Sequence, residues 1–352
     1  VDEIEKKGYK IDKKVECLLS SDSAAGVTKS IGLAMIGFAD ALNELSPDLV
    51  IILGDRTEML AAATTAMVAN MPIAHIHGGE TTEGAYDESI RHAITKMSLL
   101  HFASTEIYRK RIIQLGEHPA RVFNVGAIGL DSIKNLELLN KEDFEKSIDF
   151  QLGKKNILIT FHPVTLENQS ARGQFQAILD FLNSLNDTHL IFTHANSDKN
   201  GRVINQMIEE FVKENKKRSI AFKSLGQLRY LSALKHMDLV LGNSSSGILE
   251  VPSFNIPTIN IGDRQKGRIF SESVIQTEPN SSDLAQAFAK ATNPVYLEKI
   301  KNQKQLYGSG NAAEKIMSVL RLKKDNDLKK IFHDIGHSKT IKYKNWLFRP
   351  YF

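Results

Sequence analysis

Short apolar runs alternate with amphipathic helical stretches along most of this chain of 352 residues, and this alternation limits the possible folds more than any other feature. Strand-like runs lie at residues 49–53, 73–77, 99–103 and 122–125, and a second series lies at 157–161, 190–193, 219–222, 239–241 and 258–261. Apolar residues at helical spacing fill intervals at about 58–70, 87–97 and 105–115. Regular alternation of this kind is typical of parallel sheets covered by helices on both faces. The sequence therefore predicts an α/β protein with two Rossmann-like, doubly wound parallel sheets.

A polar and charged stretch at residues 135–155 separates the two series of strands. A chain of this length usually forms more than one domain, so we expect an N-terminal domain at 1–148 and a C-terminal domain at 149–320. A tail at 321–352 follows, and its net charge is +6. The whole chain has a net charge of +4, so the residues before the tail carry −2. Because the basic residues gather in the tail and form no stripe on the body, we expect no nucleic-acid partner.

Other features of the sequence bear on the cellular compartment of the protein and on where its natural N-terminus lies. No run of about eighteen uninterrupted apolar residues is evident, so we expect no membrane span, and the single cysteine, Cys17, is typical of a reducing cytoplasm. Only a weak strand at 15–18 precedes the strand at 49–53, whereas a doubly wound domain usually begins with a strongly apolar strand. We therefore expect the natural protein to extend upstream of Val1.

The stretch 239–250 contains the strongest candidate for a binding site. Its apolar run ends at Gly242, and three serines follow at 244–246. The apolar residues after them recur at the spacing of a helix. Serines that cap a helix, together with free backbone N–H groups, form a site for a phosphate or diphosphate. Glu250 is expected in the first two turns of that helix, where a carboxylate could bind the two vicinal hydroxyls of a ribose. An ordinary capped strand–helix loop is the alternative.

Polar residues also follow other strands of the second series. The strand at 258–261 leads to Arg264 within a run that holds three cations, the strand at 157–161 leads to His162, and the strand at 190–193 leads to Asn196. In open α/β sheets, ligands bind at the carboxyl ends of the strands. The residues together favour a nucleotide-diphosphate site, in which His162 could also protonate a leaving group.

Charged residues collect at the predicted strand ends of the first series in the same way. Asp55 follows the strand at 49–53, Glu80 follows the strand at 73–77, and Asp87 opens a helix. Carboxylates crowded into a partly dry cleft raise one another's pKa and become candidates for general acid–base catalysis. Helix caps and surface ion pairs are the alternative interpretation.

Two shorter motifs permit other readings. His75 and His77 are two residues apart, so on a strand they would point to one face and could hold a metal with Glu80, although nothing completes a four-ligand set. The run 308–313 imitates a dinucleotide fingerprint, but it follows a helical stretch rather than a strand. We read it as a glycine stop followed by a helix that Asn311 caps.

In combination these motifs resemble those of the hydrolysing UDP-N-acetylglucosamine 2-epimerases of bacterial sialic-acid-type pathways. The resemblance runs from near residue 1 to about 320, and it is carried by Gly54-Asp55-Arg56, His75-Ile76-His77-Gly78-Gly79-Glu80, Asp87-Glu88-x-x-Arg91-His92, Phe161-His162-Pro163, 242–247 and 262–268. It implies two domains like those of the B-type glycosyltransferases, with a cleft between them and UDP held mainly by the second. Two features depart from the pattern, namely His77, where some relatives have glutamate, and the lack of an initial strand with its Gly-Thr-Arg loop.

The resemblance also implies a reaction and the residues for it. UDP-N-acetylglucosamine, or a 2,4-diacetamido-6-deoxy relative, would react with water through a 2-acetamidoglucal to give the free manno sugar and UDP. No cofactor or metal is implied, and a homodimer or homotetramer in the cytoplasm is expected. Carried over by motif, the catalytic residues are Asp55, Glu80, Asp87 and His162, and those that bind UDP or sugar are Arg56, His77, Arg91, Asn196, Ser244, Ser245, Glu250 and Arg264.

Three other functions remain open from the sequence. A glycosyltransferase of the same two-domain fold would need an acceptor and leave C2 of the sugar untouched. A protein that binds a UDP-sugar without catalysis would show affinity but no turnover. A metal-dependent hydrolase using His75 and His77 would be inactivated by a chelator.

Overall fold

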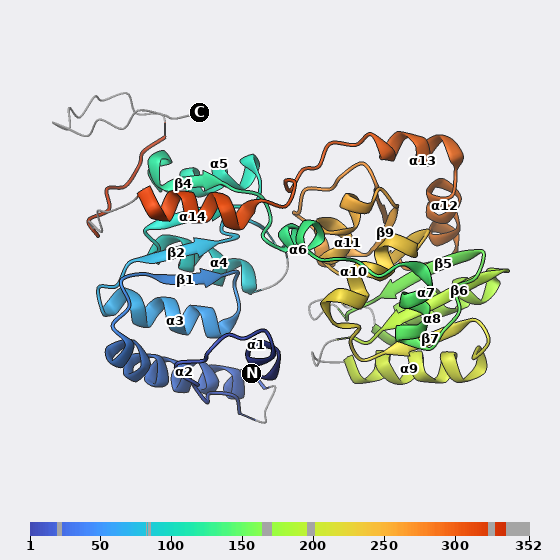
Figure 1. Cartoon of the computed structure of the whole chain (residues 1–352), viewed down its shortest axis with the longest axis horizontal. Helices are drawn as coiled ribbons and strands as arrows, with labels where there is room; N and C mark the ends of the chain where they lie inside the picture. The colour runs from blue at the N-terminus through green and yellow to red at the C-terminus, as the bar shows by residue number, and fades with distance from the viewer. Residues whose placement is uncertain are drawn as a thin grey trace. The chain divides into compact units, whose positions relative to one another are not determined.

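The computed structural model describes residues 1–19, 23–81, 83, 86–163, 171–195, 201–322 and 328–335, and these residues form two compact units. The first unit holds the described residues of 1–80, 86–125 and 314–352, and the second holds those of 81–85 and 126–313. Each unit contains one parallel sheet covered by helices, so the predicted α/β class with two Rossmann-like sheets is confirmed (Figure 1).

The sheet of the first unit has four parallel strands in the order β1-β2-β3-β4. They are β1 (Val50–Leu53), β2 (Ile73–Ile76), β3 (Leu100–Ala103) and β4 (Val122–Asn124). The helices of this unit are α1 (Asp2–Lys6), α2 (Ala24–Leu45), α3 (Thr57–Val68), α4 (Asp87–Met97), α5 (Glu106–Gln114), the 3-10 turn η1 (Pro119–Arg121) and most of α14 (Ala312–Leu322). The strands expected at 49–53, 73–77, 99–103 and 122–125 are all present. Their carboxyl ends lie along one edge of the sheet because all four run in parallel.

The sheet of the second unit has six parallel strands in the order β10-β9-β8-β5-β6-β7. They are β5 (Lys155–Thr160), β6 (Thr188–Thr193), β7 (Ser219–Phe222), β8 (Leu239–Gly242), β9 (Thr258–Ile261) and β10 (Val274–Thr277). Its helical elements are α6 (Gly129–Asn135), α7 (Lys141–Ile148), α8 (Ala171–Ser184), α9 (Gly201–Glu214), α10 (Gly226–His236), α11 (Ser246–Leu249), η2 (Val251–Phe254), η3 (Asp263–Gln265), α12 (Ser281–Ala291) and α13 (Pro294–Lys301). The sequence did not predict β10.

Both faces of the central strand β5 are buried, which explains why residues 157–159 are apolar at consecutive positions. Ile157 and Ile159 of β5 pack with side chains from α8, α9 and α12, whereas Leu158 packs with side chains from α7 and α10. Successive residues of a strand point to opposite faces, so helices on both faces require consecutive apolar residues. The layered arrangement therefore follows from the sequence pattern.

The order of the second sheet reverses between β5 and β8. From β5 the chain adds β6 and β7 on one side, and it then returns to the other side of β5 to add β8, β9 and β10. Ligands of open α/β sheets bind beside the carboxyl ends of the strands at such a reversal. The fold thus singles out the ends of β5 and β8 as a candidate site.

The chain passes between the two units at positions other than the predicted boundary at 148/149. The described residues of 81–85 already belong to the second unit, the chain enters that unit again after Val125, and it belongs to the first unit from Glu314. Phe144 and Ile148 of α7 are buried in the core of the second unit, because α7 covers one face of its sheet. Residues 328–335, part of the predicted tail, contact the first unit, where the Lys330 ammonium lies 2.7 Å from a Glu117 carboxylate oxygen.

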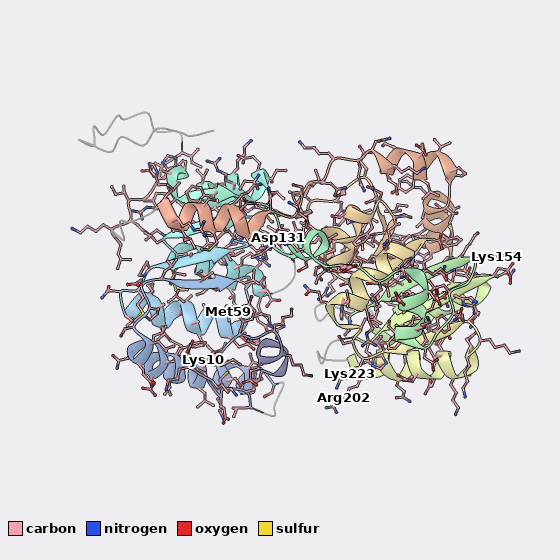
Figure 2. The ribbon with its side chains drawn as sticks, viewed as in Figure 1. Lys10, Met59, Asp131, Lys154, Arg202 and Lys223 are labelled. Atoms are coloured by element: carbon pink, nitrogen blue, oxygen red, sulfur yellow. The ribbon has the colours of Figure 1, made fainter. Side chains whose placement is uncertain are left out.

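The start of α14 differs from the sequence interpretation. The backbone N–H groups of Ala312 and Ala313 donate to the two carboxylate oxygens of Asp131, at 2.8 and 2.7 Å. Asp131 lies in α6 and is labelled in Figure 2. The side-chain oxygen of Asn311 is buried without a hydrogen-bond partner among the described residues. The cap therefore comes from Asp131, which is distant in sequence, and the prediction of Asn311 as the cap was wrong.

Among the described residues, α2 alone is long and apolar enough to cross a membrane by length and composition. The sequence analysis overlooked it because three charged residues interrupt the apolar run. In the structure α2 packs along α3, and it buries Ala34, Ala41 and Leu42. These contacts are those of a helix that covers part of the first unit.

Candidate functional site

The carboxyl ends of β5 and β8 bring His162 and the loop after Gly242 together. Thr160 of β5 pairs with Gly242 of β8, and His162 follows two residues after Thr160. Gly242 has a φ of +143°, and a Cβ atom there would lie 1.8 Å from the Thr160 carbonyl oxygen. Only glycine permits this close approach of the two strands. Gly242 therefore sets the distance between His162 and the serine loop.

Asn243 joins three parts of this site. Its side-chain oxygen accepts the His162 backbone N–H at 2.7 Å, and its Nδ2 donates to the His162 carbonyl at 2.8 Å. Its own carbonyl accepts Arg264 Nη1 at 3.0 Å and Gln265 Nε2 at 2.9 Å. Asn243 is fully buried, so these bonds fix the loops after β5, β8 and β9 relative to one another.

The sequence analysis did not assign a role to Asn243 or Gln265. The available signal was an amide side chain directly after the end of a buried strand, since a buried amide needs hydrogen-bond partners. Arg264 was predicted, and it now has a defined place between the Asn243 carbonyl and the region beside His162.

The serine loop leads into a helix much shorter than the sequence suggested. α11 spans four residues, Ser246–Leu249, and η2 follows with Pro252 in its first turn. Proline lacks the N–H that a continued α-helix would need there. The Ser245 side chain makes no capping bond, and Ser244 Oγ accepts the Ser246 N–H at 3.4 Å. Glu250 therefore lies at the junction of α11 and η2 and not inside a helix of two turns, as the sequence had led us to expect.

Burial and the charge of Arg264 lower the pKa of His162 to about 4. The imidazole is therefore neutral near pH 7 in the free protein. A neutral ring could donate one hydrogen bond to a phosphate oxygen, and a bound diphosphate would favour the protonated form. His162 is thus suited to respond to an anion beside Arg264.

The first unit holds a second group of polar residues, centred on Arg91 of α4. Its guanidinium contacts the Asp55 carboxylate through Nη2, lies 3.5 Å from Glu80 Oε2 and donates to the His77 carbonyl at 2.9 Å. Arg91 is 4% exposed and Glu80 is 1% exposed. The structure therefore brings together Asp55 and Glu80, two of the three carboxylates that the sequence placed at one site, and it adds His77 to them. The cation between the carboxylates compensates the mutual repulsion that the sequence analysis had invoked.

Glu80 has two further partners. Ser104 Oγ donates to Glu80 Oε1 at 2.7 Å, and His77 Nδ1 lies 2.8 Å from the same oxygen. Ser104 follows β3, so the sequence analysis missed it for lack of a motif. His77 has a φ of +65°, which is uncommon for a residue with a side chain. Strained backbone of this kind concentrates at functional sites.

The structure separates His75 from His77. His75 is fully buried in β2, where Nε2 lies 2.8 Å from the Gly54 carbonyl and Nδ1 lies 3.1 Å from Thr95 Oγ1. Burial lowers the pKa of His75 to about 3. Both ring nitrogens are occupied within the fold, and His77 lies beyond the end of β2. The pair therefore lacks the common face on which the metal-dependent hydrolase reading relied.

Three remaining predicted residues have different positions. Asp87 is half-buried at the start of α4, one turn before Arg91, so the two side chains share a helix face. Arg56 lies at the N-cap position of α3 without a capping bond from its side chain, and this largely exposed side chain lies 3.8 Å from Glu58. Asn196 lies outside the described residues.

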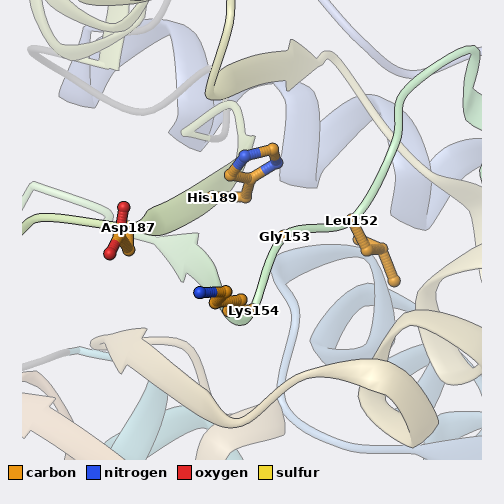
Figure 3. Close-up of a pocket in the computed structure, with 5 residues that line it drawn as sticks. All are labelled: Leu152, Gly153, Lys154, Asp187 and His189. Atoms are coloured by element: carbon orange, nitrogen blue, oxygen red, sulfur yellow. The ribbon is translucent and has the colours of Figure 1, made fainter.

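A hollow of about 460 Å³ lies elsewhere in the second unit, and Figure 3 labels the residues that line it, Leu152, Gly153, Lys154, Asp187 and His189. Lys154 and Asp187 immediately precede β5 and β6. The hollow therefore lies at the amino ends of these strands, whereas His162 and the serine loop lie at the carboxyl ends. It contains none of the predicted site residues.

Comparison of the sequence with known families gives the identification. Residues 1–321 match the sequence profile of the family described as UDP-N-acetylglucosamine 2-epimerase. The chain belongs to this family. The match covers both polar groups described above, so the resemblance first noted in the motifs is confirmed.

Relatives within the family have more specific names. A protein of Campylobacter jejuni named GDP/UDP-N,N'-diacetylbacillosamine 2-epimerase (hydrolyzing) is 47% identical over 288 residues, which cover 82% of this chain and 74% of the relative. A Legionella pneumophila protein named UDP-N,N'-diacetylbacillosamine 2-epimerase (hydrolyzing) is 36% identical, with 91% and 83% covered. The polysialic acid biosynthesis protein P7 of Escherichia coli is 36% identical, with 96% and 86% covered.

Solved structures of other 2-epimerases have the same fold. The UDP-GlcNAc 2-epimerase of Neisseria meningitidis, bound to UDP-GlcNAc, superposes with a TM-score of 0.77 at 20% identity and covers 90% of this chain and 87% of its own. The enzyme of Methanocaldococcus jannaschii, in complex with UDP-GlcNAc and UDP, gives a TM-score of 0.68 at 21% identity, with 84% and 81% covered. Both comparisons support the two-sheet architecture.

Proposed function

We propose that this chain is a hydrolysing 2-epimerase that converts a UDP-linked 2-acetamido sugar and water into the free manno-configured sugar and UDP. The observation that carries the proposal is the 47% identity to a hydrolysing epimerase, over a chain that retains both polar groups. The substrate we favour is UDP-N,N'-diacetylbacillosamine, since two relatives are named for it. UDP-N-acetylglucosamine is the second candidate. A place in sialic-acid-type sugar synthesis is consistent with the polysialic acid relative.

In this proposal the second unit binds the nucleotide. The site at β5 and β8 offers the Arg264 guanidinium, the His162 imidazole and the hydroxyls of Ser244 and Ser245 to a diphosphate, and the Glu250 carboxylate to the ribose. Charged and polar donors stabilise the negative charge that develops on UDP as its bond to C1 breaks. The predicted contact from Asn196 belongs to the same proposal.

The carboxylates of the first unit supply proton transfer. One of them takes the C2 proton while the C1–O bond to UDP breaks, which leaves a C1=C2 double bond in a 2-acetamidoglucal. Water then adds its oxygen to C1, and a proton returns to C2 from the opposite face. Glu80 is almost fully buried, whereas Asp87 is half-buried at the start of α4, so Asp87 is our choice for the base that takes the C2 proton. Arg56, Arg91 and His77 orient the sugar and the carboxylates.

Turnover in heavy water tests this reaction. If a glycal forms, solvent deuterium must appear at C2 of the released sugar, and the C2–H proton signal must disappear. Asp87→Asn should reduce both UDP release and deuterium incorporation about 100-fold or more, because one base drives both. Asp283→Asn is the matched control, since Asp283 also lies in the first turn of a helix but belongs to α12.

Other results would point to other functions. A product that keeps its original C2–H would indicate a glycosyltransferase or simple sugar–phosphate hydrolysis. Binding of UDP without release of sugar would indicate a binding protein. Loss of activity with a chelator would restore the metal-dependent reading. We also infer a cytoplasmic location, which the single free cysteine supports. We further infer a homodimer or homotetramer, and size-exclusion chromatography with light scattering tests the assembly.

A further inference from the structure

Three side chains of the second unit form a line that ends at Glu250. Tyr230 lies in α10, and its hydroxyl is 2.5 Å from Ser246 Oγ at the start of α11. Glu250 is four residues after Ser246, and its backbone N–H donates to the Ser246 carbonyl at 2.9 Å. Ser246 thus touches both Tyr230 and Glu250. The motif search treated Ser246 only as part of the serine loop, and it did not single out Tyr230.

The direction of the hydrogen bonds follows from the chemistry of the groups. Ser246 and Glu250 are four residues apart, one helical turn, so their side chains lie on the same face, and the backbone bond between them fixes this spacing. Burial raises the pKa of Glu250, and hydrogen bonding from the neighbouring Ser246 hydroxyl opposes that rise. An ionised carboxylate only accepts hydrogen bonds, and a serine hydroxyl has one proton. Ser246 must therefore donate to Glu250, which leaves Tyr230 as the donor to Ser246. Burial and the charge of Glu250 raise the pKa of Tyr230, so the phenol keeps the proton that it donates.

One oxygen of the Glu250 carboxylate faces a glycine of α6. The residue that faces Oε1 from α6 is Gly129, where an added Cβ would lie 3.5 Å from that oxygen. A glycine has no side chain that could compete for the carboxylate. A carboxylate held on one side by a hydroxyl can accept two vicinal hydroxyls of a ribose on the other.

We propose that Tyr230, acting through Ser246, holds the Glu250 carboxylate in the orientation that recognises the 2′- and 3′-hydroxyls of the bound nucleotide. Tyr230 and Ser246 are then positioning residues, and they set the preference for a ribonucleotide over a deoxyribonucleotide. The inference rests on the proposed function only in that Glu250 is taken as the ribose ligand. It adds two residues that neither touch the diphosphate nor take part in proton transfer.

The test compares UDP with 2′-deoxy-UDP by titration calorimetry. Wild type should bind UDP about tenfold or more tightly than 2′-deoxy-UDP, as expected for a hydrogen bond to a carboxylate. Tyr230→Phe removes one hydroxyl and should reduce this preference about threefold or more, mainly by weakening UDP binding. With the UDP-sugar, KM should rise while kcat stays within about twofold, because Glu250 contacts the nucleotide rather than C2.

Three further variants separate positioning from a general loss of structure. Ser246→Thr keeps a hydroxyl and should retain the ribose preference, whereas Ser246→Ala should lose it. Tyr230→Phe combined with Ser246→Ala should be no worse than Ser246→Ala alone, because Tyr230 acts only through Ser246. Tyr296→Phe is the matched control, since it removes a phenol that donates to the Glu272 carbonyl at 2.7 Å.

The outcomes distinguish this inference from the proposed function. If Tyr230→Phe weakens UDP and 2′-deoxy-UDP equally, or if wild type binds both equally, the positioning role is overturned. A fall in kcat at unchanged KM would overturn it as well. If wild type prefers UDP and Tyr230→Phe reduces that preference, but no sugar is released from either candidate substrate, the positioning role stands and the epimerase reaction fails.

Discussion

Replacing Arg91 with methionine should destabilise the first unit strongly, because it leaves a buried carboxylate without its cation. Glu80 is 1% exposed, and Arg91 lies 3.5 Å from it and also contacts Asp55. Removal of one partner of a buried ion pair costs about 3–5 kcal/mol. Glu80 keeps its bonds to Ser104 and His77, so we expect a loss near the lower limit, about 3 kcal/mol.

Urea unfolding followed by circular dichroism measures this loss. For a slope of about 3 kcal/mol per M, the midpoint of the first unit should fall by about 1 M. Glu80→Gln removes the carboxylate charge that Arg91→Met leaves without its cation. The double variant Arg91→Met/Glu80→Gln should therefore be about 1–3 kcal/mol more stable than the sum of the two single losses predicts. Arg56→Met is the control, since its arginine is 73% exposed and should matter by less than about 1 kcal/mol. Additive losses, or a loss from Arg91→Met no larger than the control's, would refute the reasoning.

Three other perturbations test separate parts of the structure. Burial lowers the pKa of His162 to about 4 in the free protein, and a bound diphosphate would raise it, so binding of UDP near pH 6 should take up a proton. Calorimetry in buffers of different ionisation enthalpy should detect this uptake. Zero uptake would place the diphosphate away from the His162 ring. Hydrogen bonds from His101, Lys330 and Lys96 lower the pKa of Glu117 to about 2 against the opposing effect of burial, so its stabilisation is present above pH 4.5 and is lost as the pH falls towards 2. Glu117→Gln should flatten the dependence of unfolding free energy on pH in that window, and an unchanged slope would contradict this assignment. Gly242→Ala places a Cβ 1.8 Å from the Thr160 carbonyl oxygen, so it should lower the free energy of unfolding, measured by thermal denaturation, by about 3 kcal/mol or more. Gly32→Ala is the control, since a Cβ there meets nothing within 4 Å, and it should be neutral or stabilising. Equal stability of the two variants would show that the strands can separate freely.

The strands other than β10, and the helices α3, α4 and α5, were predictable because their signals are local. A run such as Ile157-Leu158-Ile159 is apolar at every position, and both faces of β5 are buried. The same locality explains the failures. Asn311 was expected to cap α14 because it precedes that helix, but the carboxylate of Asp131, distant in sequence, caps it instead. α11 was expected to be longer, and it ends after four residues.

For the candidate sites, the sequence supplied the residue types and the structure supplied their partners. The motifs singled out Asp55, Glu80 and Arg91, but the spacing could not show that one guanidinium lies between the two carboxylates. The roles of the predicted site residues, and the domain assignments that go with them, remain predictions for the experiments above.

By itself the sequence determined the fold class, the family and the polar residues that follow most of the strands, because hydrophobic periodicity and short motifs are properties of neighbouring residues. Only the tertiary structure decided that the sheet order reverses between β5 and β8, that Asn243 ties His162 to Arg264, and that Tyr230 reaches Ser246. The hydrogen bonds among these features join residues that are 16 to 81 positions apart in the sequence, and the reversal is a property of the order of the strands. No local pattern specifies them, since they arise when separate strands and helices pack into one sheet and bury the polar groups at its edge.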